Sequence, residues 1–283
     1  MKLLAISDLH LANRKNREGL LALPAFPEDW LILAGDVGER ESQLHFALSV
    51  LAPRFRQIIW VPGNHDLWCM ADEAEGLRGE ARYQRLVSIC RNYGVLTPED
   101  PYTHWPGDDE DDPGYVLAPL FLLYDYTFRP DHIPPEEAVA WAEESGVLCS
   151  DEYLLKPDPY PSRQAWCHAR VRRTEKRLEA AVASGRRTIL INHFPLRHDL
   201  FELRRIPRFS IWCGTRLTED WHQRFRASVV VYGHLHIKGT QFRDGVRFEE
   251  VSLGYPRDWN QNLGVEPYLR QILPAPKTWL TRS

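Results

Sequence analysis

The chain has 283 residues, of which 43% are hydrophobic and 26% charged, a composition typical of a folded globular protein long enough to bury a sizeable core. The formal net charge of −4 gives no overall basic field that would favour nucleic acid, and the five scattered cysteines never form CxxC, which argues against a disulfide framework or a zinc knuckle. Polar Ser7 and Asp8 follow residues 1–6 directly, so the apolar start of the chain is too short for a secretion signal. No apolar run approaches the roughly 20 residues of a membrane span. We therefore expect a cytoplasmic protein that does not enter a membrane.

The first third of the chain alternates strands and helices. Apolar runs predict strands at 3–6, 30–34 and 57–61. Apolar residues at helical spacing predict helices at 39–52 and 81–92. Alternation of this kind is typical of βαβ units with parallel strands. We therefore expect an α/β fold.

The middle of the chain is less regular. A strand is predicted at 115–123, after an acidic run at 108–112 that we interpret as a solvated loop. The next stretch, 124–161, is rich in proline and aromatic residues and contains a short helix predicted near 136–144. We interpret it as an insertion or lid within a single domain spanning 1–283, because long loops of this kind often carry function.

The last third contains one long helix and four more strands. The strands are predicted at 188–191, 229–232, 240–243 and 246–251. Asp244-Gly245 joins the last two and is a strong hairpin signal. The helix, at 162–183, carries several arginines and lysines. We interpret them as a solvated face rather than a nucleic-acid surface, because Glu175 and Glu179 interrupt the run.

Short polar motifs follow five of the predicted strands. They are Asp8-Leu9-His10, Gly35-Asp36, Gly63-Asn64-His65-Asp66, Asn192-His193 and Gly233-His234-Leu235-His236. The ends of strands are where α/β folds gather ligand-binding groups. Aspartate, asparagine and histidine, in these numbers, are the side chains that two bridged divalent metal ions need.

The first, second and last motifs indicate how such ions could be held. In an extended segment residues i and i+2 point the same way, so Asp8 and His10 could bind one ion together, and His234 and His236 form a similar pair. The two carboxylate oxygens of Asp36 could bridge two ions about 3.5–4 Å apart. Taken alone, the first two motifs are weak evidence, because chance or a polar turn explains them, whereas two core histidines bonded to the backbone are a less credible explanation of the pair after Gly233.

The two remaining motifs add ligands and a group for the substrate. The Asn64 amide oxygen is a neutral ligand, and His65 cannot easily bind the same ion from the neighbouring position, which frees it for substrate. Asp66 could then fix the tautomer of His65. His193 alone could equally be a core histidine. The order of all five motifs at strand ends is what favours a metal site.

This order resembles the pattern D-x-H, G-D, G-N-H-D/E, H and G-H-x-H of the calcineurin-like metallophosphoesterase superfamily, and it spans residues 8–236. The resemblance implies a four-layer α/β sandwich of two mixed β-sheets flanked by helices, with the metals at the carboxyl ends of the strands. It implies seven ligands: Asp8, His10 and His236 for one ion, Asn64, His193 and His234 for the other, and Asp36 as the bridge. His65 would protonate the leaving oxygen and Asp66 would orient it.

The same resemblance implies hydrolysis of a phosphodiester or monoester by a water that the two ions activate. Nitrogen and oxygen ligands without thiolate fit Mn²⁺, Fe²⁺ or Zn²⁺, and we expect Mn²⁺. Two residues depart from the pattern of relatives. Asn192 precedes His193, where relatives often have Ser or Gly, and Glu39 stands where purple acid phosphatases carry a tyrosine ligand. An iron-tyrosinate centre is therefore not implied.

Further stretches resemble one branch of stand-alone bacterial metallophosphoesterases, similar to proteins that release 4′-phosphopantetheine from holo acyl carrier proteins. They are 94–102, 121–126, 212–215 and 251–257. Carrier proteins are small and acidic, which would suit the arginines after His193. Arg197 and Arg216 are the candidate substrate-binding residues, and the alternative is that these loop arginines pair with surface acids.

Two rival functions stay open at this point. A nuclease or cyclic-nucleotide phosphodiesterase would use the same metal centre, although the acidic net charge argues mildly against a nuclease. A non-catalytic interaction module could also be built on this fold. Such modules usually lack ligands, however, and all seven are present in this chain.

Overall fold

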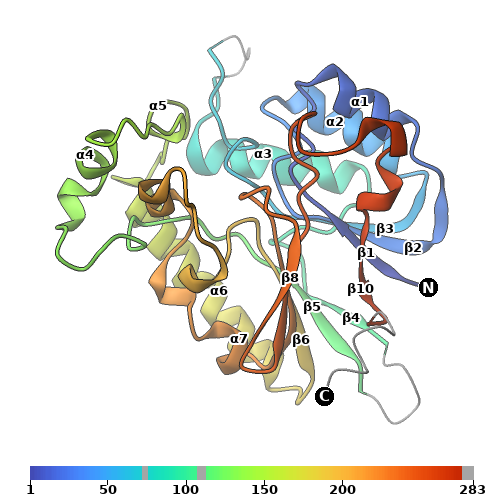
Figure 1. The fold of residues 1–283 in the computed structure, drawn as a ribbon. Coiled ribbons are helices and arrows are strands. Elements are labelled where there is room, and N and C mark those ends of the chain that lie inside the picture. The colour runs from blue at the N-terminus through green and yellow to red at the C-terminus, as the bar shows by residue number, and fades with distance from the viewer. Residues whose placement is uncertain (72–75, 107–112, 276–283) are drawn as a thin grey trace.

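The computed structural model describes residues 1–71, 76–106 and 113–275, and the acidic run at 108–112 lies outside the described residues. Two mixed β-sheets face each other and helices flank them (Figure 1). The predicted fold class, a four-layer α/β sandwich, is confirmed. Within the described residues, no helix is both long and apolar enough to cross a membrane.

The first sheet has four strands in the order β10-β1-β2-β3. Its strands are β1 (Leu3–Ile6), β2 (Phe26–Leu33), β3 (Phe55–Trp60) and β10 (Arg270–Leu273). As predicted, β1, β2 and β3 are parallel, and β10 adds an antiparallel edge. The helices that follow these strands are α1 (Arg14–Leu21), α2 (Glu41–Leu51) and α3 (Gly79–Asn92).

The second sheet has six strands in the order β4-β5-β6-β7-β9-β8, with β5, β6, β7 and β9 parallel and both edges antiparallel. Its strands are β4 (Thr103–Trp105), β5 (Tyr115–Pro119), β6 (Arg187–Ile191), β7 (Ala227–Tyr232), β8 (Gly239–Arg243) and β9 (Val246–Glu250). The remaining α-helices are α4 (Ala138–Glu143), α5 (Asp151–Leu154), α6 (Arg163–Val182) and α7 (Trp221–Arg224). Short 3₁₀ turns are η1 (Pro135–Glu137), η2 (His198–Leu200), η3 (Pro207–Trp212), η4 (Arg216–Thr218), η5 (Gln261–Leu263) and η6 (Glu266–Tyr268).

Strands such as β1, β5 and β7 are apolar on both faces because each sheet is covered on both sides. Alternate residues such as Ala5, Ile59 and Ile189 form one core between the two sheets. Their neighbours in sequence face the helices, as Trp60 and Leu190 do. In Figure 1, α1, α2 and α3 lie beside the first sheet, whereas α6 and α7 lie beside the second. This packing fixes the strand ends at which the motifs stand.

Two predictions needed correction here. The strand predicted at 115–123 ends at Pro119, because its partner β6 ends at Ile191. The arginines of α6 are not simply a solvated face: Arg170 is buried, with its Nη2 2.7 Å from Glu99 Oε1 and its guanidinium 4.5 Å from the centre of the Phe121 ring. Part of this basic face therefore anchors the helix to the body of the protein.

Candidate metal centre

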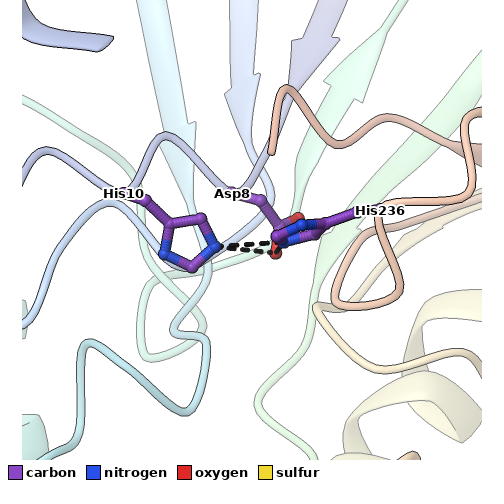
Figure 2. Close-up of side chains that lie close together, drawn as sticks. All are labelled: Asp8, His10 and His236. Atoms are coloured by element: carbon purple, nitrogen blue, oxygen red, sulfur yellow. Dashed lines mark hydrogen bonds and ion pairs between the residues drawn. The ribbon is translucent and has the colours of Figure 1, made fainter. Parts of the chain in front are cut away.

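The carboxyl ends of strands from the two sheets lie close together. The chain leaving β1 bonds to the chain leaving β9, through Ser7 N to Val251 O at 3.0 Å. Asp8, His10 and His236 consequently turn toward one another (Figure 2). His236 Nε2 is 3.1 Å from Asp8 Oδ1 and 3.0 Å from His10 Nε2. These three side chains form the first candidate metal-binding group.

A second group lies next to the first. The ligand atoms of Asp36, His193 and His234 all lie within 4.8 Å of one another. His193 Nε2 is 3.4 Å from Asp36 Oδ2 and 3.3 Å from the Asn64 Oδ1. Asp36 also forms a group with His10 and His65, whose ligand atoms again lie within 4.8 Å of one another. The structure thus brings together all seven predicted ligands, and Asp36 of the second group also lies within the same limit of His10 from the first.

The backbone at most of the predicted ligands is left-handed and not extended, which corrects the reasoning that paired Asp8 with His10 and His234 with His236. The backbone φ angle is positive at five of the seven predicted ligands: Asp8 (53°), His10 (42°), Asp36 (53°), His234 (73°) and His236 (55°). Such a conformation costs a non-glycine residue about 1–2 kcal/mol and persists only where the surroundings hold it. Hydrogen bonds from Asp8 N to Gly35 O (2.9 Å) and from His10 N to Asp36 O (3.1 Å) do so here. Among these residues, Asp8 and His10 share one group, whereas His234 and His236 belong to different groups.

Two motif glycines are required by close approach rather than by flexibility. A Cβ atom at Gly63 would lie 2.1 Å from Asp36 Oδ1, and one at Gly233 would lie 2.4 Å from Asp8 Oδ2. Both distances are far below van der Waals contact. Any larger residue at either position would therefore displace a carboxylate of the centre.

Partners outside the ligand set orient the imidazoles and the amide. His193 Nδ1 lies 2.9 Å from Ala34 O, and His236 Nδ1 lies 3.2 Å from Asp258 Oδ2, which leaves the Nε2 atom of each ring for the centre. Asn64 Nδ2 donates to Asp151 Oδ1 at 3.0 Å. Asp151 and Asp258 were not predicted. Neither lies in a motif, and only the fold brings them to the site.

The surroundings of His65 correct the role predicted for Asp66. The two oxygens of Asp66 accept hydrogen bonds from backbone N–H groups on the two loops after β2 and β3. The group near the His65 ring is Glu39, whose Oε1 is 3.5 Å from His65 Nδ1. Burial opposes the protonation of His65, but Asp36 and Glu39 raise its pKa. Asp66 therefore holds the two loops together, and Glu39 is the carboxylate that lies beside the His65 ring.

The electrostatics of the groups fit bound cations. Burial lowers the pKa of His10 to about 4 and that of His234 to about 3, which keeps both imidazoles neutral as ligands must be. Burial also opposes the protonation of His236, but the Asp8 carboxylate raises its pKa to about 8. His234 Nε2 is buried without a hydrogen-bond partner among the described residues. The buried carboxylates of Asp8 and Asp36, together with the His234 nitrogen that lacks a partner, suit two cations of borderline hardness.

The groups open into a cavity of about 290 Å³ with an aromatic and aliphatic wall. The Trp68 ring lies 3.7 Å from that of His65, and the Tyr255 ring lies 4.4 Å from that of His10, as measured between centroids. Leu148, from the insertion, also lines the cavity and is 66% exposed. The cavity can therefore hold a phosphate at its polar floor and a less polar group along its wall.

The predicted substrate-binding arginines do not line this cavity. Arg197 forms ion pairs with Asp199 (2.8 Å) and Asp244 (3.1 Å). Arg216 donates from Nε to Thr127 O at 2.9 Å and has Asp131 within 3.5 Å. These contacts favour the alternative reading, in which the loop arginines pair with nearby acids and carbonyls.

Comparison with known proteins agrees with this geometry. The model of the calcineurin-like phosphoesterase family matches residues 1–238. The chain therefore belongs to the calcineurin-like phosphoesterase family, whose members are hydrolases that depend on two metal ions.

Within this family the chain is similar to a mycobacterial enzyme. It is 48% identical over 277 residues to the [acyl-carrier-protein] phosphodiesterase PptH of Mycobacterium tuberculosis (strain ATCC 25618 / H37Rv), covering 96% of this chain and 83% of that protein. The crystal structure of the phosphopantetheinyl hydrolase PptH from the same organism superposes with a TM-score of 0.90 at 47% identity, covering 97% of this chain and 96% of that one. The predicted family resemblance is confirmed.

Proposed function

We propose that this chain cleaves the phosphodiester that links 4′-phosphopantetheine to a holo acyl carrier protein, using two divalent metal ions. The observation that carries the proposal is the convergence of all seven predicted ligands in a chain 48% identical, over 96% of its length, to an acyl-carrier-protein phosphodiesterase. A non-catalytic module is disfavoured, because such modules usually lack ligands.

The residues divide into two ligand sets and one bridge. We assign Asp8, His10 and His236 to one ion, Asn64, His193 and His234 to the other, and Asp36 to both. We propose Mn²⁺, with Fe²⁺ or Zn²⁺ as alternatives, because the ligands are imidazole, amide and carboxylate without thiolate. When bound, such ions polarise the phosphoryl oxygens and lower the pKa of water.

The remaining steps belong to side chains of the cavity. His65 lies at the edge of the centre, with Nε2 3.9 Å from Asp36 Oδ2, and it is the candidate donor of the proton to the leaving oxygen. Glu39 stabilises the protonated ring. Trp68 packs against the same ring and restricts its orientation. The apolar wall then borders the organic part of the substrate.

The insertion at 124–161 supports the proposal that the chain is a single domain, 1–283, because Leu148, Cys149, Ser150 and Asp151 line the same cavity as the ligands.

We also propose a cytoplasmic location. All five cysteines are unpaired, as is usual in a reducing compartment.

The test uses a purified holo acyl carrier protein, Mn²⁺ and mass spectrometry. The proposal predicts that the carrier protein loses the mass of the 4′-phosphopantetheine arm, and that Asp36→Ala prevents this loss. Bis-p-nitrophenyl phosphate serves as a control for general diesterase activity. Turnover of that ester with no loss from the carrier protein would reject the substrate and leave a nuclease or cyclic-nucleotide phosphodiesterase as the function.

A further inference from the structure

Asp151 is a buried carboxylate that belongs to none of the five motifs. It begins the short helix α5 (Asp151–Leu154) inside the insertion, and its relative exposure is 0%. A carboxylate removed from water is costly unless its oxygens find donors. Both donors to its Oδ1 are side chains of the metal site, whereas its buried Oδ2 has no hydrogen-bond partner among the described residues, which suggests that its place is functional.

A single oxygen of Asp151 holds both of these side chains. Its Oδ1 accepts from Asn64 Nδ2 at 3.0 Å and from Trp68 Nε1 at 2.7 Å. The first bond fixes the orientation of the Asn64 amide, because a flipped amide would bring its carbonyl oxygen against the carboxylate. Asn64 Oδ1 is thereby directed toward His193 Nε2, 3.3 Å away, in the second candidate metal group.

The second bond acts on the candidate proton donor. The Trp68 ring packs against the His65 imidazole at a centroid distance of 3.7 Å and an interplanar angle of 30°. A bond from its indole N–H to Asp151 fixes the plane of the ring and limits how far His65 can turn. Asp151 therefore touches a metal ligand directly and the proton donor through one intermediate.

The insertion is joined to the same loop by its backbone as well. Cys69 N donates to Leu154 O at 2.9 Å, one residue after Trp68. Helix α5 is thus attached to the segment that carries Asn64, His65 and Trp68 at both of its ends. A change in the insertion would consequently be transmitted to the metal site.

We propose that Asp151 is a positioning residue that couples the insertion at 124–161 to the second metal site and to His65. This inference rests on the proposed assignment of Asn64 as a metal ligand. Asp151→Ala removes the acceptor. We expect it to weaken binding of the second ion about 10–100-fold, the usual effect of losing a group that orients a ligand. Asp151→Asn keeps an oxygen acceptor in place, and we expect it to retain both ions.

The experiment titrates metal-free protein with Mn²⁺ and counts bound ions per chain by elemental analysis. Asp131→Asn is the matched control, because Asp131 lies in the same insertion and its side chain is 93% exposed. Equal affinity of Asp151→Ala and the parent for both ions would overturn the inference. So would an equal loss in Asp151→Asn or in the Asp131 control. A parent chain that binds fewer than two ions would instead refute the proposed function itself.

Trp68→Phe provides a second test in case Asp151→Ala does not fold. It removes the indole donor, keeps an aromatic ring beside His65, and leaves the bond between Asp151 and Asn64 intact. We expect both ions to bind as in the parent, while kcat falls more for diesters with poor leaving groups than for nitrophenyl esters. An equal fall for both kinds of ester would overturn the coupling to His65.

Discussion

Asp66 offers a sharp test of how the site is built. Its side chain is almost fully buried and accepts four backbone hydrogen bonds. Oδ2 accepts from Asp36 N (2.9 Å) and Gly63 N (2.9 Å), and Oδ1 from Val37 N (3.1 Å) and Gly38 N (3.2 Å). The carboxylate thus connects the loop of the bridging ligand to the loop of Asn64.

Asp66→Asn should therefore destabilise the fold rather than only slow the reaction. The amide would place an NH₂ group where one oxygen now accepts two N–H groups, so two buried backbone N–H groups would lose their acceptor. At about 1–3 kcal/mol for each buried donor left without a partner, the loss is about 2–6 kcal/mol. The total stability of a protein is about 5–15 kcal/mol, so the effect is large.

Urea unfolding of metal-free protein measures this loss, and Glu39→Gln is the matched control. Glu39 contacts the His65 ring and is partly exposed, so we expect its variant to retain stability and to lose activity on poor leaving groups. The reasoning would be refuted if Asp66→Asn unfolded at the same urea concentration as the parent while showing the activity pattern expected of Glu39→Gln. That result would restore Asp66 as the residue that orients His65.

Three further predictions concern the donor, the bridge and the wall of the cavity. His65→Ala should keep both ions and lose about 10²–10⁴-fold in kcat on diesters with poor leaving groups, with a smaller loss on nitrophenyl esters. Metal analysis and steady-state kinetics test this, and equal losses of kcat on both kinds of ester would contradict the role of proton donor. Gly63→Ala should lower the number of bound ions, because its Cβ would lie 2.1 Å from Asp36 Oδ1; full metal content would contradict the close approach. Leu148→Asp should raise KM for holo carrier protein and leave that for bis-p-nitrophenyl phosphate unchanged, because Leu148 is 66% exposed on the cavity wall; an unchanged KM for the carrier protein would show that Leu148 does not contact this substrate.

The fold was largely predictable because buried strands appear in the sequence as short, continuous apolar runs. Runs such as Leu3–Ile6 and Ala227–Tyr232 are apolar on both faces, and the motifs follow them directly. Elements without such an apolar run were not predicted. Helix α1 buries only Asn16 and Leu20, and strand β10 becomes a strand through antiparallel pairing with β1 from the far end of the chain.

The ligands were predictable from the motifs, but their surroundings were not. The left-handed backbone at Asp8 and His10 depends on hydrogen bonds to Gly35 and Asp36, which are distant in sequence. Asp151 lies 87 residues from Asn64, and no local pattern marks its bond to that side chain. Long-range contacts of this kind are visible only in the folded structure.

The count of metal ions in the parent and in Asp36→Ala tests the central claim most directly. Asp36 lies in two of the three candidate metal-binding groups. With excess Mn²⁺, elemental analysis should find two ions per chain in the parent and fewer in the variant, whose activity should be abolished. Two retained ions in Asp36→Ala would contradict the shared carboxylate on which this account depends.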